Sequence, residues 1–257
     1  MTDYDRPVVL PTLEWGVRGR GRALLLHGLS SSAATWWRIA DALARAGYRV
    51  TAPDLRGHGN APHTSSYRLS GYAADLWELG SGWDLVVGHS LGGTLSSLIC
   101  AREHFARRLV LLDPVLMVPE DEFDDLMADH LSELDIAGDQ QAFAARNPRW
   151  HPEDAAIKAF AALQTSRFVV ERTLTDNRPW WYLDLLSNVR IATTVLGADP
   201  AYGALFDPTI GEEIARRNQQ IRTMVISGAG HSVHCDAPEA VLDVLLRDGA
   251  VRTRLHQ

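Results

Sequence analysis

Six short apolar runs recur along the chain, and helical patterns separate them. The runs are almost continuously apolar rather than alternating, which is typical of strands covered by helices on both faces. They span residues 23–28, 48–54, 83–90, 107–114, 191–200 and 222–231. Helical periodicity covers residues 36–46, 69–79, 91–104, 208–218 and 238–246. This alternation predicts an α/β fold with a mostly parallel sheet flanked by helices.

One interval breaks the alternation. Residues 115–188 contain helical patterns, such as EDEFDDLMADHLSEL and PEDAAIKAFAAL, but no convincing strand. Because this is too long for an ordinary connection, we expect a helical cap over 115–188, inserted into a core formed by 1–114 and 189–257. The interval also holds Trp150, Trp180 and Trp181. We expect them to shape an apolar substrate pocket; the alternative is that they pack the cap against the core.

Composition narrows the class of protein. A chain of 257 residues with 46 % hydrophobic content can bury one large core. The formal charge is -7 and no run of basic residues occurs, so we expect no nucleic-acid partner. No apolar run approaches the roughly 18 residues of a membrane helix, and the first residues lack a secretory-signal pattern. With two cysteines, neither in a Cys-x-x-Cys arrangement, we expect a soluble, cytoplasmic protein. The oligomeric state stays open.

The segment GHSLGG, residues 88–93, lies between an apolar run and a helical pattern. In a Gly-x-Ser-x-Gly turn the serine occupies a strained backbone conformation, and the small neighbours let strand and helix approach closely. Such a turn would aim the Ser90 hydroxyl at the carboxyl edge of the sheet, where open parallel sheets bind their ligands. An ordinary glycine-rich turn is the alternative. We predict that Ser90 is a nucleophile.

A serine hydroxyl needs a base to be reactive at neutral pH. His231 ends the segment GAGH after the last apolar run, so it can reach the same edge of the sheet, and we predict that it is the general base. His234 lies three residues further on and would suggest a metal pair, but no third ligand accompanies it. We therefore expect no metal.

A carboxylate should orient the histidine, and two aspartates are candidates. Asp113 and Asp199 both follow apolar runs, and both satisfy the chain order serine, aspartate, histidine. We prefer Asp199, because Asp113 precedes Pro114 and suits a residue that ends a strand and begins the cap. Asp113 remains the alternative acid.

An oxyanion hole requires two donors fixed near the serine. One is expected to be the amide of Leu91, the residue after the nucleophile, at the start of a helix. The other is expected to be the amide of Leu29, in the loop after the first apolar run, where Gly28 permits a close approach. The loop also reads as a simple entry to the following helix, and both interpretations can hold together.

Four segments in this order resemble the motifs of the α/β-hydrolase superfamily, in its serine-nucleophile branch with a helical cap. They are His27-Gly28, the segment DLRGHG at 54–59, GHSLGG at 88–93 and Gly230-His231. The resemblance implies that Arg56 ties loops together. One departure concerns the acid, since the family's usual position three residues after Gly197 holds Pro200 here. Some relatives, among them haloalkane dehalogenases and zearalenone lactonases, carry the acid after the strand that here ends at Asp113.

The resemblance implies hydrolysis without a cofactor. The expected substrate is a small, largely apolar ester or lactone, cleaved through an acyl-enzyme on Ser90 with His231 as base. A non-catalytic ligand receptor is the alternative from another class. Carbon–carbon bond hydrolysis, perhydrolysis and hydroxynitrile cleavage are alternatives on the same residues, because fold and triad do not separate these reactions.

Overall fold

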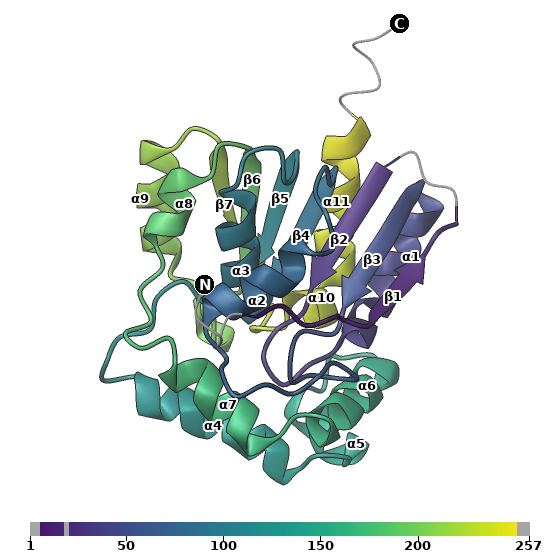
Figure 1. Cartoon of the computed structure of the whole chain (residues 1–257), viewed down its shortest axis with the longest axis vertical. Helices are drawn as coiled ribbons and strands as arrows, with labels where there is room; N and C mark the ends of the chain where they lie inside the picture. Colours follow the sequence, from purple (N-terminus) through teal and green to yellow (C-terminus); the bar gives the residue numbers. More distant parts are fainter. Residues whose placement is uncertain (1–5, 18–20, 251–257) are drawn as a thin grey trace, which may run out of the picture.

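The computed structural model describes residues 6–17 and 21–250. A seven-stranded sheet runs through the molecule in the order β1-β3-β2-β4-β5-β6-β7 (Figure 1). The strands are β1 (Thr12–Trp15), β2 (Gly21–Leu26), β3 (Tyr48–Pro53), β4 (Leu85–His89), β5 (Arg108–Leu112), β6 (Ala192–Gly197) and β7 (Ile221–Val225). From β3 to β7 all neighbouring strands are parallel, and β1 pairs antiparallel with β3.

The helices lie on both faces of this sheet and across one end of it. Those outside the insertion are α1 (Trp37–Arg45), α2 (Leu69–Trp77), α3 (Leu91–Cys100), α9 (Pro208–Arg217), α10 (Val233–Asp236) and α11 (Pro238–Ala250). Those of the insertion are α4 (Phe123–Asp135), α5 (Gln140–Arg146), α6 (Pro152–Leu163), α7 (Arg167–Thr175) and α8 (Asp184–Asn188). The predicted α/β fold with a mostly parallel sheet is confirmed. No helix among the described residues is long and apolar enough to cross a membrane.

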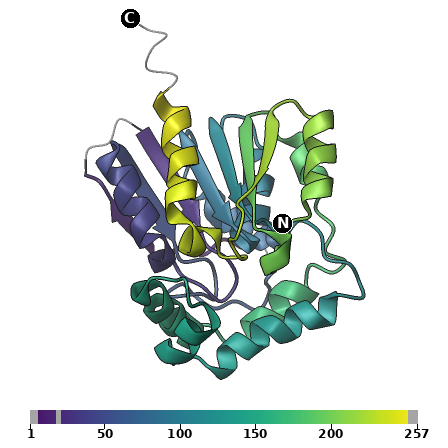
Figure 2. The same ribbon diagram turned by 180° about the vertical axis from the view of Figure 1, so that it is seen from behind.

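Two hydrophobic clusters explain why the strands read as continuously apolar. In β2, Leu24 and Leu26 belong to the cluster under α2 and α3, whereas Ala23 and Leu25 belong to the cluster under α1 and α11. Successive side chains of a strand point to opposite faces, so burial on both faces demands apolar residues throughout. Figure 2 shows α1 and α11 on the face opposite to α2 and α3, whereas Ile214 of α9 packs against the cluster under α2 and α3.

Strand β1 escaped the sequence analysis. It is only four residues long, it lies at the edge of the sheet, and most of its side chains are exposed. A short edge strand buries too little surface to leave an apolar run in the sequence.

The segment between β5 and β6 is described throughout, and it contains helices but no strand. Helices α4 to α7 lie across the end of the sheet (Figure 1), whereas α8 packs beside α3 and α9. The large cluster under α2 and α3 continues into the insertion through Phe123 and Val170. Helices α5 and α6 enclose a smaller cluster built on Phe143 and Ala159. The boundaries of a separate cap domain stay a prediction.

Candidate active site

Ser90 lies at the turn between β4 and α3 with φ 54° and ψ -120°. Among the described residues four non-glycine residues have a positive φ, and Ser30, Ser90 and Asp113 are three of them. The glycines around Ser90 are sterically required: a Cβ on Gly88 would lie 2.2 Å from the Gly92 carbonyl oxygen, and one on Gly92 would lie 2.2 Å from that of Leu26. Backbone strain of this kind persists where the surrounding packing enforces it, and it is common at functional sites.

The carboxylate that holds His231 belongs to Asp113. His231 Nδ1 donates a hydrogen bond of 2.6 Å to Asp113 Oδ2. The Asp113 side chain is fully buried, and its two oxygens also accept from the backbone amides of Ala198, Leu205 and Phe206 at 3.0, 2.9 and 3.2 Å. These bonds fix the carboxylate, which in turn fixes the histidine ring.

Our preference for Asp199 is therefore corrected. Asp199 accepts hydrogen bonds from the amides of Ala201 at 3.0 Å and Gly228 at 2.7 Å, and its own amide binds the Ala229 carbonyl. The amides of Gly228 and Ala201 lower the pKa of this carboxyl group. Asp199 thus shapes the loop that leads to His231 but does not contact the ring. Sequence order alone allowed both acids, and only the folded loops separate them.

The two expected oxyanion donors flank Ser90. A Cβ on Gly28 would lie 3.0 Å from Ser90 Cβ, so the loop containing Leu29 passes directly beside the nucleophile. Leu91 is the first residue of α3, where an amide has no partner within its own helix. The backbone amides of Leu29 and Leu91 donate no hydrogen bond to any of the described residues. Both amides are therefore available to a ligand atom next to Ser90.

No hydrogen bond joins Ser90 Oγ to His231 among the described residues. The residue before Ser90 holds the two segments together, since His89 Nε2 binds the His231 carbonyl at 3.0 Å and the two rings lie 4.8 Å apart. Catalytic hydrogen bonds often tighten only when substrate binds. The arrangement therefore fits a nucleophile and base that await a ligand.

Three buried histidines lie close to the site: His27, His89 and His234. Desolvation lowers the pKa of His27 to about 4 and the pKa of His234 to about 3, and it lowers the pKa of His89 as well. His234 Nε2 lies 3.1 Å from Thr35 Oγ1, and its ring packs on Trp36. Within the described part of the chain, no group of three His, Cys, Asp or Glu side chains is arranged to hold a metal ion.

The three tryptophans lie in different surroundings. Trp180 is buried in the main core, and its indole donates to the Val115 carbonyl at 2.7 Å. Trp181 is 59 % exposed and lines a groove of about 620 Å³ beside α8 and α9. Trp150 is half-buried. No ring contact or hydrogen bond between described residues joins the three, so they do not form one aromatic wall. Their part in substrate binding stays a prediction.

Arg56 performs the structural task that the resemblance implied. Its guanidinium is fully buried and binds both carboxylate oxygens of Asp75, with contacts of 2.7 and 2.8 Å. It also donates to the carbonyls of Gly71 and Ser66. The DLRGHG segment is thereby anchored to α2.

Polar contacts from the insertion to the site escaped the sequence analysis. Arg149 binds the Gly228 carbonyl and lies 3.5 Å from the Asp236 carboxylate, next to the histidine loop. Lys158 of α6 reaches the Ser30 carbonyl in the loop beside Ser90. Neither belongs to a recognisable motif, and the only signal in the sequence is that Lys158 is the single lysine of the chain.

Comparison with known proteins agrees with this geometry. A model described as the alpha/beta hydrolase family matches residues 23–244. The chain belongs to the alpha/beta hydrolase family. The resemblance inferred from the four motifs is thereby confirmed, and membership supports a hydrolase activity.

Two relatives of this alpha/beta hydrolase are named as lipases. Lipase LipV of Mycobacterium tuberculosis is 39 % identical over 107 residues, which cover 40 % of this chain and 40 % of LipV. The sn-1-specific diacylglycerol lipase ABHD11 of Mus musculus is 26 % identical over 249 residues, 86 % of this chain and 78 % of that protein. The match to LipV thus spans less than half of that lipase.

Solved structures share the fold of this alpha/beta hydrolase. The crystal structure of E-2-(acetamidomethylene)succinate hydrolase superposes with a TM-score of 0.77 at 22 % identity, covering 92 % of this chain and 93 % of that one. An esterase from Exiguobacterium antarcticum gives a TM-score of 0.75 at 16 % identity, with 95 % of each chain covered. At this level of identity the likeness concerns the fold alone.

Proposed function

We propose that this protein hydrolyses a carboxylic ester or lactone of a small, largely apolar substrate through an acyl-enzyme on Ser90. The observation that carries the proposal is the 2.6 Å bond between His231 Nδ1 and Asp113, formed beside a strained serine that lies next to two unused amides. A histidine whose Nδ1 carries the proton presents Nε2 as a base. Such a constellation has nucleophile, base and orienting group in one place.

Acylation follows from these positions. Ser90 Oγ forms a bond to the carbonyl carbon while its proton passes to His231 Nε2, and the buried Asp113 carboxylate stabilises the resulting imidazolium. The amides of Leu29 and Leu91 donate to the oxygen that becomes negatively charged. The carbon–oxygen bond to the leaving group then breaks, and the leaving alkoxide takes the proton from His231.

Deacylation repeats the sequence with water. His231 removes a proton from the water molecule that attacks the acyl carbon, and Ser90 regains a proton when the ester bond to it breaks. The buried Leu29, Leu91 and Val115 beside the nucleophile favour an apolar acyl group. The lipase names of LipV and ABHD11 fit ester chemistry but leave the substrate of this chain to experiment.

Rapid-mixing kinetics with p-nitrophenyl acetate tests the acyl-enzyme. Wild type should release a burst of about one p-nitrophenolate per protein molecule before steady turnover, whenever deacylation is slower than acylation. Ser90→Ala should show neither burst nor turnover while retaining its circular-dichroism spectrum. A folded wild type that binds esters without turning them over would contradict the proposal and favour the receptor. A panel of p-nitrophenyl esters of increasing chain length and of γ- and δ-lactones then separates the two substrate classes.

A further inference from the structure

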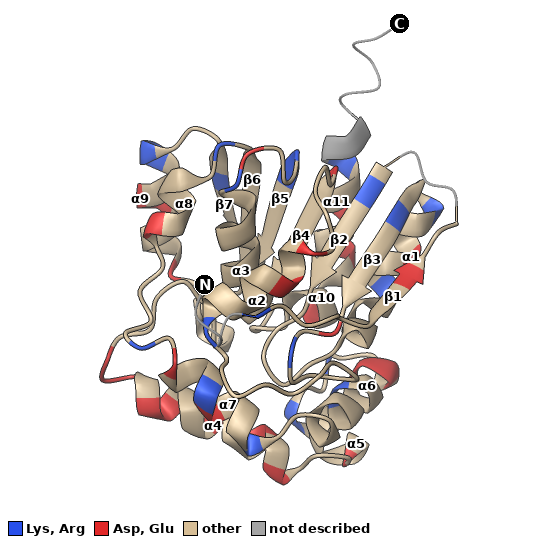
Figure 3. Cartoon of the chain, viewed as in Figure 1, with Lys and Arg blue, Asp and Glu red and all other residues tan. Residues whose placement is uncertain are grey.

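The single lysine of the chain lies in the insertion and points at the site. Among 25 Lys and Arg residues only Lys158 is a lysine, and its side chain is 14 % exposed. Its ammonium donates to the Ser30 carbonyl at 3.0 Å and to Glu133 Oε2 of α4 at 2.7 Å. Figure 3 shows acidic and basic residues interspersed over the insertion's helices. What distinguishes Lys158 is therefore not its charge but its contact with the Ser30 carbonyl.

The Ser30 carbonyl belongs to the turn that presents Leu29. Ser30 directly follows Leu29 and has φ 55°, in the left-handed region that residues with a Cβ avoid. Its own Oγ is buried and has no hydrogen-bond partner among the described residues, so the side chain does not hold the turn. The contact from Lys158 supplies a charged hydrogen bond to the backbone of this strained residue, and charge-assisted bonds are the stronger kind.

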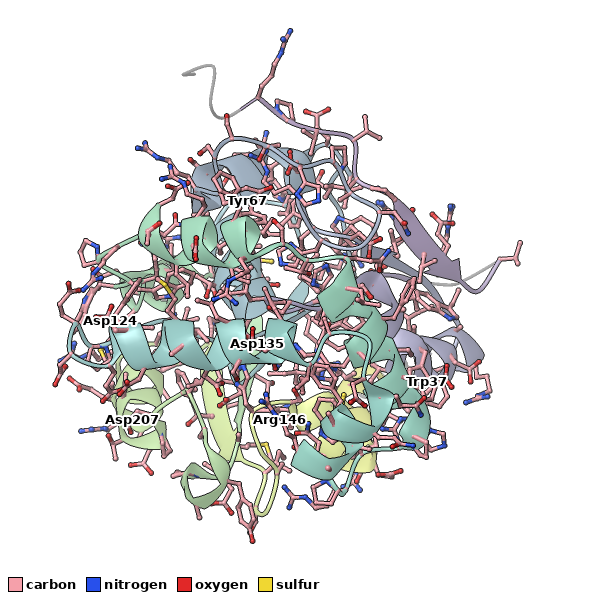
Figure 4. All side chains as sticks on the ribbon, turned by 90° about the horizontal axis from the view of Figure 1, so that it is seen from below. Trp37, Tyr67, Asp124, Asp135, Arg146 and Asp207 are labelled. Atoms are coloured by element: carbon pink, nitrogen blue, oxygen red, sulfur yellow. The ribbon has the colours of Figure 1, made fainter. Side chains whose placement is uncertain are left out.

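Helix α6 is fastened over this loop by one face. Asp154 and Lys158 are four residues apart, which places both on the same side of the helix. Asp154 accepts from Trp37 Nε1 at 2.8 Å and forms an ion pair with Arg38, both in the segment that follows the Ser30 turn. Figure 4 shows Trp37 beside the insertion's helices. Asp154 therefore holds the helix against the segment after the turn, whereas Lys158 contacts the Ser30 carbonyl in the loop beside Ser90.

Glu133 completes the arrangement from α4. Burial alone would raise the pKa of Glu133, but the ammonium of Lys158 and the neighbouring His130 together lower it to about 2. The carboxylate therefore stays ionised and holds the ammonium in place. Lys158 is consequently constrained by one insertion helix while it acts on a core loop.

We propose that Lys158 is a positioning residue for the oxyanion hole: by binding the Ser30 carbonyl, helix α6 fixes the turn that aims the Leu29 amide at the oxyanion. This inference rests on the proposed function. Because a developing oxyanion exists only in the transition state, an error in Leu29 should lower kcat and leave KM nearly unchanged. A purely structural contact would instead alter stability, or both constants together.

The test compares Lys158→Met with Asp154→Asn, which loosens the same helix face without touching the loop. Lys158→Met should lower kcat for p-nitrophenyl butyrate by about 100-fold, as expected for a misplaced catalytic group, with KM within about threefold of wild type. Its inhibition constant for an aryl trifluoromethyl ketone, which forms an oxyanion on the serine, should rise by a similar factor. Asp154→Asn should keep kcat within about fivefold, even if its melting temperature falls.

Rescue separates positioning from general damage. Lys158→Cys treated with 2-bromoethylamine carries a lysine analogue, and Cys100 and Cys235 are buried, so the treated wild type is the control. Aminoethylation should restore most of kcat. If Lys158→Met does not fold, Lys158→Arg, which keeps charge and donors, should fold and retain a larger kcat than unmodified Lys158→Cys.

The outcomes distinguish this inference from the proposed function. A wild type without burst or turnover overturns the function, and the inference falls with it. An active wild type together with a Lys158→Met variant of unchanged kcat overturns the inference alone. Equal losses of kcat in Lys158→Met and Asp154→Asn, or no recovery after aminoethylation, also overturn it, because the helix would then be merely docked.

Discussion

Replacing Asp113 by asparagine separates the proposed acid from its rival more sharply than any other change. The Oδ1 atom accepts from the amides of Ala198 and Phe206, and Oδ2 accepts from the amide of Leu205 and from His231. An asparagine has one oxygen and one NH₂ group for these two positions. Its NH₂ group must therefore face backbone donors whichever way the amide turns.

The less costly orientation is the inactive one. With NH₂ at the Oδ1 position, two backbone amides lose their acceptor; with NH₂ at the Oδ2 position, only Leu205 does, at about 1–3 kcal/mol. In that second orientation the NH₂ group donates to His231 Nδ1, which moves the ring proton to Nε2. A histidine in this tautomer cannot accept the Ser90 proton. We expect kcat to fall about 10⁴-fold, which corresponds to about 5 kcal/mol of transition-state stabilisation.

Asp199→Asn is the matched control. Its carboxylate accepts one backbone amide on each oxygen, so asparagine loses a single hydrogen bond in a loop. We expect kcat/KM for p-nitrophenyl butyrate to fall by less than about tenfold. Circular dichroism and urea unfolding establish that both variants are folded. Full activity in Asp113→Asn together with an inactive, folded Asp199→Asn would refute the assignment.

Three further predictions concern the loop, the buried ion pair and acid stability. Gly28→Ala would place a Cβ 3.0 Å from Ser90 Cβ and should lower kcat/KM by about 10² with little loss of stability. Gly197→Ala is the control, because its new Cβ meets no atom nearer than 3.6 Å. An equal loss of kcat/KM in Gly197→Ala would contradict the reasoning. Asp75→Asn removes the charged partner of the buried Arg56 and should lower the free energy of unfolding, measured in urea, by about 3–5 kcal/mol. Glu14→Gln removes the exposed ion pair with Arg49 and should lower it by at most about 1 kcal/mol. Similar losses in the two variants would contradict the assigned role of burial. Burial lowers the pKa of His27 to about 4 and the pKa of His234 to about 3. Below pH 6.5 the unfolded chain therefore binds protons on these histidines that the folded protein does not bind. The free energy of unfolding should accordingly fall between pH 6.5 and about pH 4, by up to about 1.4 kcal/mol per pH unit for each histidine. His234→Phe should reduce this slope in urea titrations at pH 7 and pH 5, and an unchanged slope would contradict it.

Residues with local signatures were predictable from the sequence. Ser90 lies between a buried strand and a helix and is flanked by glycines that the packing requires, so pattern and structure agree there. Fully buried strands left apolar runs that placed the sheet. The edge strand β1 left none, because its side chains are mostly exposed.

The acid and the lysine depend on tertiary structure. Asp113 and Asp199 both follow strands, and what separates them is that the loops after β6 donate three amides to Asp113 while Asp199 is occupied by its own turn. Lys158 reaches Ser30 across 128 positions of sequence. No local pattern encodes such a contact, because it depends on how the insertion folds back over the sheet.

The most direct test of the central claim is intact-mass labelling with a fluorophosphonate, on wild type and on Ser90→Ala. The reagent reacts with a serine only when a base activates it and an oxyanion hole receives the phosphoryl oxygen. The account predicts one adduct per molecule of wild type, located at Ser90 by peptide mapping, and none on Ser90→Ala. A folded wild type that acquires no adduct would contradict the account. Equal labelling of wild type and of Ser90→Ala would also contradict it.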